Sequence, residues 1–424
     1  MKKPELLAPA GNLEKLKVAI HYGADAVYLS GKSYGLRSFA GNFTIPQMKE
    51  GIDFAHKRGV KVYVTVNIFP RYDDLERLSE YFIDLKQLGA NAIIISDPGI
   101  LAMAKKLVPN IPLHLSTQAN TTNWLSVQFW KDQGVSRINL ARELSFSEIE
   151  YIKKKTDMEI EIFIHGAMCI SYSGRCLLSN YLTHRYSNRG ECSQPCRWRY
   201  FLMEEKRPGM YFPVFEDDHG SYILSSKDLC LIEHIPRLIE AGIDSLKIEG
   251  RMKGISYVGN VVRIYRQAID EYLIKPDEFD LSKARLEELK KVSNRDYTTG
   301  FFFEDPLRGL QNYSSSSYIQ THDLVGVVRE VLGDNKIKVE VRNRIELGDE
   351  IEFIGKSGRI NRLYLENMSN EDCRKIRIAQ PNQLVTLMVD FPTDKNDLIR
   401  KQKIKKGDSN VSSKNNRSQE DRSL

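Results

Sequence analysis

The sequence lacks the marks of several large classes of protein. No apolar run approaches the roughly 20 residues that span a bilayer, and the first ten residues lack the apolar stretch of a secretory signal. A cytoplasmic protein without membrane contact is therefore expected. The net charge of +6 is small for 424 residues, and the last 32 residues carry nine basic against five acidic side chains. The rest of the chain is thus nearly neutral, which gives no sign of an extended basic surface.

Common catalytic and nucleotide-binding motifs are missing too. No G-x-G-x-x-G occurs, so a dinucleotide-binding sheet has no support from a phosphate fingerprint. No H-E-x-x-H occurs, which removes the commonest zinc peptidase signature. Enzymatic chemistry, if present, must come from other residues.

Eight short runs rich in Val, Ile and Leu recur through the first 250 residues, with helical segments between them. Most are continuous rather than alternating, which indicates strands buried on both faces of a parallel sheet. Eight βα units in this length predict a TIM-type (β/α) barrel, an α/β fold, with a doubly wound open sheet as the alternative. The runs are Glu5–Ala8, Ala26–Ser30, Val60–Asn67, Ala92–Ser96, Pro112–Ser116, Arg137–Ala141, Glu159–His165 and Ser245–Glu249.

The chain divides into four predicted parts. Residues 1–303 form the barrel domain, which carries a long cysteine-bearing insertion after strand seven, at about 166–243. Residues 304–322 are a linker. Short alternating runs then predict a small all-β domain over 323–392. Residues 393–424 are rich in Lys, Ser and Asn, which predicts a disordered basic tail.

Five of the six cysteines lie within 62 residues of one another, at positions 169, 176, 192, 196 and 230. In a large chain without a secretory signal, this density indicates metal or redox chemistry rather than disulfides. The spacing is neither that of a zinc ribbon nor that of a compact ferredoxin, so zinc and an iron–sulfur cluster both stay open. Cys373 stands alone and is interpreted as an ordinary thiol.

Three segments of the sequence resemble the peptidase U32 family. These are Glu5–Gly11, the stretch from Glu161 through Cys176 to Ser179, and Leu246–Lys253. The resemblance covers roughly residues 4–390. Within the family, the sequence is most similar to the branch of tRNA hydroxylation proteins.

The resemblance implies a cofactor and a reaction. It implies a [4Fe–4S] cluster held by Cys169, Cys176, Cys192 and Cys230, with Cys196 as a fifth candidate for the four places. It also implies oxygen-independent hydroxylation of tRNA, which forms 5-hydroxyuridine at the wobble position, with prephenate as the associated co-substrate. A homologous partner subunit is a further expectation.

Polar residues at the ends of the predicted strands are the candidates for catalysis and for binding a small dicarboxylate metabolite. Arginine suits this role because its guanidinium binds a carboxylate through two hydrogen bonds. The alternative interpretation is structural: these side chains orient the cysteine loop or pair with one another. The candidates are His165, Asn67, Gln118, Arg142, Glu249 and Arg251.

Basic residues with an interleaved aromatic residue surround the cysteines and suggest contact with RNA. Such residues bind phosphates and stack on bases, whereas the alternative is a packed tryptophan among surface ion pairs. The candidates are Arg185, Arg189, Arg197, Trp198 and Arg199.

Two other functions stay open. A U32-type, collagenase-like peptidase needs an activated nucleophile, for which a cysteine paired with His165 or His184 is the candidate. The second alternative is a non-catalytic subunit that binds a cluster or relays electrons.

Overall fold

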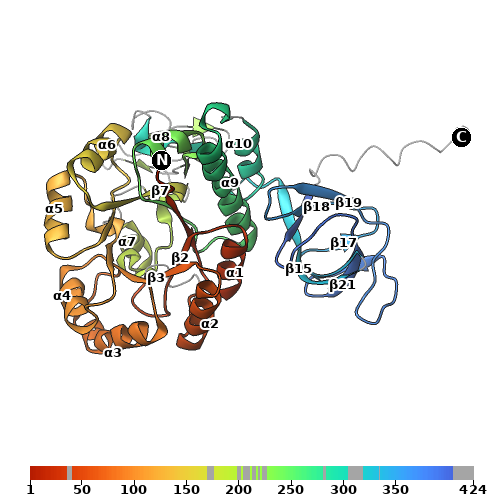
Figure 1. Cartoon of the computed structure of the whole chain (residues 1–424), viewed down its shortest axis with the longest axis horizontal. Helices are drawn as coiled ribbons and strands as arrows, with labels where there is room; N and C mark the ends of the chain where they lie inside the picture. Colours follow the sequence, from red (N-terminus) through yellow and green to blue (C-terminus); the bar gives the residue numbers. More distant parts are fainter. Residues whose placement is uncertain are drawn as a thin grey trace, which may run out of the picture. The chain divides into compact units, whose positions relative to one another are not determined.

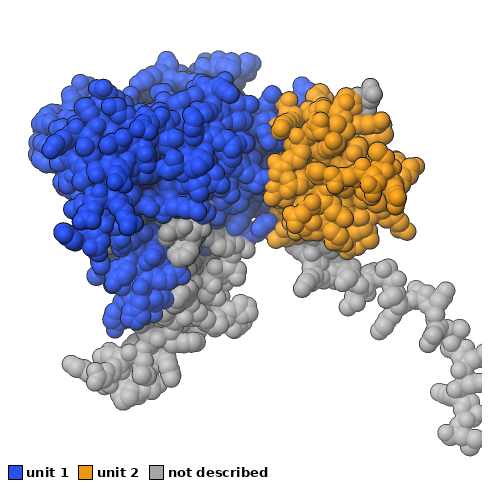
Figure 2. All heavy atoms as spheres, turned by 90° about the horizontal axis from the view of Figure 1, so that it is seen from below, with its two compact units in different colours: residues 1–320, 354–359, 396–398 blue, residues 321–353, 360–395, 399–424 orange. Residues whose placement is uncertain are grey.

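A computed structural model describes most of the chain in two compact units. The described residues are 1–35, 41–169, 176–197, 202–203, 211–212, 216–217, 220–221, 227–279, 283–303, 319–333 and 335–403. Unit 1 comprises residues 1–320, 354–359 and 396–398, and unit 2 comprises the remainder (Figure 2). In the described part of the chain, every helix is too short or too polar to cross a bilayer.

Unit 1 is built on a closed barrel of eight parallel strands. Strands β1 to β7 pair in chain order, and β13 pairs with both β7 and β1 and so closes the sheet. The predicted TIM-type barrel is confirmed, and each of the eight predicted runs supplies one barrel strand. The strands are β1 (Glu5–Pro9), β2 (Ala26–Leu29), β3 (Lys61–Val66), β4 (Ala92–Ile95), β5 (Leu113–Leu115), β6 (Arg137–Asn139), β7 (Glu159–Ala167) and β13 (Ser245–Ile248).

Helices surround the strands on the outside of the barrel (Figure 1). Their ends follow the sequence signals: Asn12 caps the start of α1 through its side chain, and Gly89 ends α3 with a φ of 79°, which L side chains rarely adopt. The helices are α1 (Leu13–His21), α2 (Ile45–His56), α3 (Tyr72–Leu88), α4 (Pro98–Leu107), α5 (Trp124–Asp132), α6 (Phe146–Lys155), α8 (Ile235–Glu240), α9 (Ile255–Ile274) and α10 (Lys283–Lys290).

The long insertion lies between β7 and β13. Its described residues include helix α7 (Leu178–Thr183), three short 3-10 turns, and the strands β8 (Leu202–Met203), β9 (Tyr211–Phe212), β10 (Glu216–Asp217), β11 (Gly220–Ser221) and β12 (Asp228–Cys230). Strand β12 runs antiparallel to β7 outside the closed barrel and pairs on its other side with β14 (Tyr297–Thr298). The insertion thus leaves from the C-terminal end of β7 and returns to the same strand, at the face where TIM barrels carry their sites.

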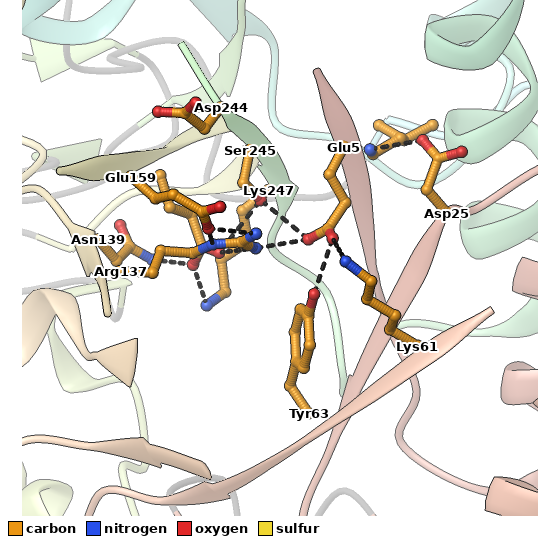
Figure 3. A network of polar contacts seen from close by, with 12 residues as sticks. Glu5, Asp25, Lys61, Tyr63, Arg137, Asn139, Glu159, Asp244, Ser245 and Lys247 are labelled. Carbon is orange, nitrogen blue, oxygen red and sulfur yellow. Dashed lines mark hydrogen bonds and ion pairs between the residues drawn. The ribbon is translucent and has the colours of Figure 1, made fainter. Parts of the chain in front are cut away.

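The barrel interior is apolar on one side and charged on the other. The apolar side comes from β1 to β4 and includes Leu7, Tyr28 and Ile94. On the other side, Glu161 accepts hydrogen bonds from Lys247 at 2.7 Å and from Asn139 at 2.9 Å. These side chains belong to a polar network that also includes Glu5, Tyr63 and Arg137, near the N-terminal ends of the strands (Figure 3).

Glu161 stays ionised although it is buried. Burial by itself would raise the pKa of this carboxyl, but the attraction of Lys247 and Arg137 outweighs burial and holds the pKa below its usual value. Arg137 is shared, because its guanidinium also contacts Glu5 at 2.5 Å and Glu159 at 2.9 Å. The buried charges therefore form one mutually compensated set rather than isolated pairs.

Unit 2 is an all-β domain, as predicted. Its six-stranded sheet has the order β19-β18-β22-β15-β16-β21, and a separate pair, β17 and β20, completes the fold. Buried apolar side chains such as Val339, Ile351 and Val385 form its core. The strands are β15 (His322–Gly333), β16 (Lys336–Val341), β17 (Ile345–Glu346), β18 (Glu350–Ile354), β19 (Ile360–Tyr364), β20 (Ile378–Ala379), β21 (Leu384–Met388) and β22 (Leu398–Gln402).

The predicted tail needs a correction at its start. Strand β22 lies within the stretch 393–424 that was predicted to be disordered, and it sits between β18 and β15 in the sheet. The prediction was wrong there because an arginine in a basic stretch was expected to be exposed to solvent. Arg400 is instead buried and forms an ion pair with Glu352 at 2.7 Å. Residues 404–424, and 304–318 of the predicted linker, lie outside the described residues.

Removing the partner of Glu161 is expected to destabilise the barrel. Lys247→Met leaves a buried carboxylate with less compensation, so the free energy of unfolding should fall by about 3–5 kcal/mol. Trp124 and Trp130 lie on α5 of unit 1, and no tryptophan of the sequence lies in unit 2, so tryptophan fluorescence in urea follows unit 1. Lys49→Met, which removes an exposed pair with Asp53, is the control and should cost less than about 0.5 kcal/mol. Equal losses would contradict the assigned role of the network.

A buried histidine predicts a defined pH dependence of stability. Burial lowers the pKa of His114 to about 3, against about 6.5 in an unfolded chain. The unfolded state therefore binds the proton first, and stability is lost as the pH falls from about 6.5 towards 3, by about 1.4 kcal/mol per unit for this residue. The free energy of unfolding, measured in urea between pH 6.5 and 5, should therefore fall less steeply with falling pH for His114→Phe than for the native chain. An unchanged pH dependence would show that folding does not alter the protonation of this side chain.

Candidate functional site

Polar side chains gather at the C-terminal ends of the barrel strands, around an inner cavity of about 140 Å³. Asn67 follows β3, Gln118 follows β5, Arg142 follows β6, and Glu249 and Arg251 follow β13. All five line the inner cavity, together with Asn139 and Lys247 from the barrel interior. The structure thus brings together the five strand-end candidates that the sequence had suggested.

Amide groups form one wall of the inner cavity. Asn67 donates from Nδ2 to Gln118 Oε1 at 2.7 Å, and Ser96 Oγ donates to the Asn67 carbonyl oxygen at 3.1 Å. These bonds orient the Gln118 amide, whose Nε2 is buried and has no partner among the described residues. Most buried donors in proteins are hydrogen-bonded, so this amide stands out among the side chains of the cavity wall.

Two arginines supply positive charge to the inner cavity. Arg142 donates from Nη1 to the Ala167 carbonyl oxygen at 2.9 Å, lies 3.5 Å from Glu249 Oε2, and stacks 3.8 Å from the centre of the Phe163 ring. Arg251 is buried and donates from Nη1 to Thr65 Oγ1 at 3.3 Å. Both guanidinium groups are held in place before any ligand arrives, which lowers the entropic cost of binding an anion.

Four cysteines line the same inner cavity. Cys169 follows β7, Cys176 precedes α7, and Cys192 and Cys196 lie at a 3-10 turn, Pro195–Arg197. The backbone N–H of Gln194 donates to Cys192 Sγ at 3.4 Å. Soft sulfur ligands of this kind suit iron–sulfur clusters or zinc.

Short hydrogen bonds hold the cysteine segment in place. Ser179 Oγ accepts from the Ser193 backbone N–H at 3.0 Å, and Ser187 Oγ donates to the Cys176 carbonyl oxygen at 2.6 Å. Arg189 makes a two-pronged ion pair with Asp74 at the start of α3, at 2.6 and 2.8 Å. This hydrogen bond from Arg189 lowers the pKa of Asp74. The insertion is thereby attached to the barrel mouth.

The four thiols share a cavity but do not form a closed ligand set. Among the described residues, no group of three or more His, Cys, Asp or Glu side chains is close enough to hold a metal ion. Residues 170–175, which join Cys169 to Cys176, lie outside the described residues. The soft sulfur donors that line this cavity are of the kind that an iron–sulfur cluster requires.

Cys230 lies apart from the other four. It sits on β12 opposite His165 of β7, and its Sγ is 3.7 Å from the hydroxyl of Tyr265. Burial raises the pKa of this thiol to about 12, so it stays protonated there. The structure therefore brings together Cys169, Cys176, Cys192 and Cys196, and Cys230 does not line the cavity that they share.

His165 also lies away from the inner cavity. Its ring packs among Tyr257, Tyr265 and Tyr297, and burial lowers its pKa to about 3. Within the described residues, no histidine lines the inner cavity. A cysteine–histidine pair of the kind that a cysteine peptidase uses is therefore not formed at this site.

The proposed RNA contacts are only partly described. Arg189 is engaged by Asp74, and Arg185 lies beside α7. The side chain of Arg197, and the whole of Trp198 and Arg199, fall outside the described residues. Sequence reasoning also missed Asn139 and Lys247, which the alternation of side chains along β6 and β13 could have placed inside the barrel.

An outer pocket of about 580 Å³ adjoins the inner cavity. It shares Arg142, Cys169, Cys192, Cys196 and Glu249 with the inner cavity. Its other wall comes from the loop after β13 and the start of α9, with Lys253, Gly254, Ser256 and Tyr257. Cys169, Cys192 and Cys196 thus line both the inner cavity and the outer pocket.

Comparison with known proteins agrees with the resemblance seen in the sequence. The model of Peptidase family U32 matches residues 11–312, and that of the Peptidase family U32 C-terminal domain matches residues 320–400. The chain is 47% identical to the tRNA hydroxylation protein P1 of Bacillus subtilis (95% of this chain, 96% of the relative). It is 40% identical to the tRNA hydroxylation protein P of Escherichia coli (93% and 95%).

A third relative acts on another RNA. The chain is 40% identical to a 23S rRNA 5-hydroxycytidine synthase of Escherichia coli, over 66% of this chain and 41% of that protein. The matches to the family models and to the two tRNA hydroxylation proteins span nearly the whole chain. The chain therefore belongs to peptidase family U32.

Proposed function

We propose that this protein is an RNA-modifying hydroxylase that acts on tRNA through an iron–sulfur cluster. The observation that carries the proposal is the set of four cysteines that line one polar cavity at the barrel mouth. Relatives that match the chain almost end to end are named as tRNA hydroxylation proteins. The product that we propose is 5-hydroxyuridine at the wobble position, formed without molecular oxygen and with prephenate as co-substrate.

Cys169, Cys176 and Cys192 are the proposed ligands for three of the four positions of a [4Fe–4S] cluster. The shared cavity supports Cys196 as the fourth ligand, whereas the family resemblance implies Cys230, which is buried against Tyr265. When bound, the cluster would supply a redox-active or Lewis-acidic centre.

The remaining residues of the inner cavity bind and orient. Arg142 and Arg251 are proposed to hold the carboxylates of a small dicarboxylate, because both guanidinium groups are fixed by the neighbouring protein. Gln118, whose amide is oriented by Asn67, lines the same cavity. Glu249, held 3.5 Å from Arg142, limits the excess of positive charge.

Cluster content and tRNA modification should be lost together. Alanine at Cys169, Cys176 or Cys192 is expected to remove the broad absorbance near about 400 nm that an iron–sulfur cluster gives. In a deletion strain, the same variants should fail to restore 5-hydroxyuridine, measured by mass spectrometry of tRNA nucleosides. Cys373→Ala, which alters an exposed thiol of unit 2, is the matched control and should keep both. Comparing Cys196→Ala with Cys230→Ala then assigns the fourth ligand.

Two outcomes would count against the proposal. A colourless protein that contains zinc would remove the redox chemistry. Modified tRNA that persists after loss of the cluster would leave the cluster a structural or electron-relaying role.

Arg251→Lys tests the anion-binding role of the inner cavity. Lysine keeps the charge but cannot form two parallel hydrogen bonds to a carboxylate, so the KM for prephenate should rise at least about tenfold. The cluster absorbance should stay unchanged, because Arg251 supplies no sulfur. Arg58→Lys, at an exposed arginine stacked on Phe54 of α2, provides the control. An unchanged KM would place the carboxylate elsewhere.

A further inference from the structure

The N-terminus of helix α9 opens into the outer pocket. Gly254, the residue before the helix, is extended (φ −72°, ψ 169°) and supplies no side-chain cap, and the first turn holds no acidic residue. The first backbone bond is from Val258 N–H to the Gly254 carbonyl oxygen, so the N–H groups before it have no partner within the helix. A 20-residue helix presents about half a positive charge at this end.

A buried arginine, Arg142, supports the binding of a ligand in the same pocket. Arg142 lines the outer pocket and is only 8% exposed. Its Nε is buried and has no partner among the described residues. Burying a cationic side chain is costly to the folded protein, and an anion in the adjoining pocket would offset part of that cost by its charge.

The charge balance of the outer pocket favours an anion. Among the residues that the structure describes, its charged lining consists of two cations, Arg142 and Lys253, and one carboxylate, Glu249. Glu249 is engaged by Arg142 at 3.5 Å, and Lys253 Nζ donates to the Ser293 carbonyl oxygen at 3.2 Å, with Asp228 4.0 Å away. One positive charge remains in excess among the lining residues, and the helix N-terminus adds to it.

The loop between β13 and α9 leaves space for such a ligand. A Cβ atom placed on Gly254 would meet nothing within 4 Å, so the space in front of the helix is open. By contrast, a Cβ atom on Gly250 (φ 154°) would lie 2.5 Å from Tyr257 Cε1, so the turn requires glycine there. In TIM barrels, phosphate sites frequently form at the loops after strands seven and eight and an adjoining helix N-terminus.

We propose that the outer pocket binds one oxyanion, a phosphate or a carboxylate group, between the N-terminus of α9, Lys253 and Arg142. Because Cys169, Cys192 and Cys196 line the same pocket, the anion lies beside the cysteines. Its source is either the backbone phosphate of an RNA or the carboxylate of a small metabolite. Only this choice of source rests on the proposed function; the binding of an oxyanion does not.

Gly254→Asp provides a test that separates binding from folding. An aspartate at this position caps the helix, so thermal stability without ligand should stay equal or rise. The same carboxylate occupies the helix N-terminus and repels a second anion. Calorimetric titration of the full-length, cluster-loaded chain with inorganic phosphate should therefore show at least a tenfold loss of affinity. Gly254→Asn, a neutral cap of the same shape, should lose less.

The source of the anion follows from two further titrations of the same proteins. Weaker binding of tRNA to Gly254→Asp assigns the site to an RNA phosphate, and weaker binding of malonate with unchanged tRNA binding assigns it to a metabolite carboxylate. Lys253→Gln serves as the second variant. It keeps a donor for Ser293 but loses the charge, so its affinity for the same ligand should fall several-fold.

Equal affinities of native, Gly254→Asp and Lys253→Gln proteins for phosphate, malonate and tRNA would overturn the proposal. Cluster absorbance and tRNA hydroxylation are recorded on the same preparations. If the native protein binds phosphate but lacks a cluster or hydroxylation, the proposed function fails and the oxyanion site stands.

Discussion

The structure depends on a carboxylate that is buried inside the barrel. Glu161 projects from β7 into an interior where Lys247 of β13 and Asn139 of β6 donate to it. These three strands adjoin one another in the sheet and include the pair that closes the barrel. An ionised group in such a place is tolerated only when its partners are fixed, and here the partners come from the strands themselves. The charged side of the interior thus ties together the part of the barrel from which the insertion leaves.

The same asymmetry explains where the candidate site lies. Strands β1 to β4 fill their share of the interior with apolar side chains, whereas β6, β7 and β13 bring polar groups up to the mouth. Lys247 belongs to both regions, since it lines the inner cavity and binds Glu161. The polar network near the N-terminal ends of the strands is therefore continuous with the binding groups at their C-terminal ends.

The barrel was predictable from the sequence, and parts of the site were not. Runs such as Ala92–Ser96 are apolar throughout because both faces are buried, which is a strong local signal. Strand β22 carries no such signal, because it is basic in sequence and Arg400 is buried only through a distant partner, Glu352. The cysteines were recognisable as a group, but the position of Cys230 depends on the antiparallel pairing of β12 with β7. No local pattern reveals such a pairing.

The return of the insertion to its strand of origin has a consequence for how the insertion can vary. Asp228, where the chain comes back, pairs with Ala167, where it departs. The two ends of an excursion of some sixty residues are thus fastened together at one point of the scaffold. Lengthening a loop whose ends are already joined costs little chain entropy, about 0.6 kcal/mol for each doubling. Changes in the length and sequence of the segment between these two residues are therefore compatible with an unchanged barrel.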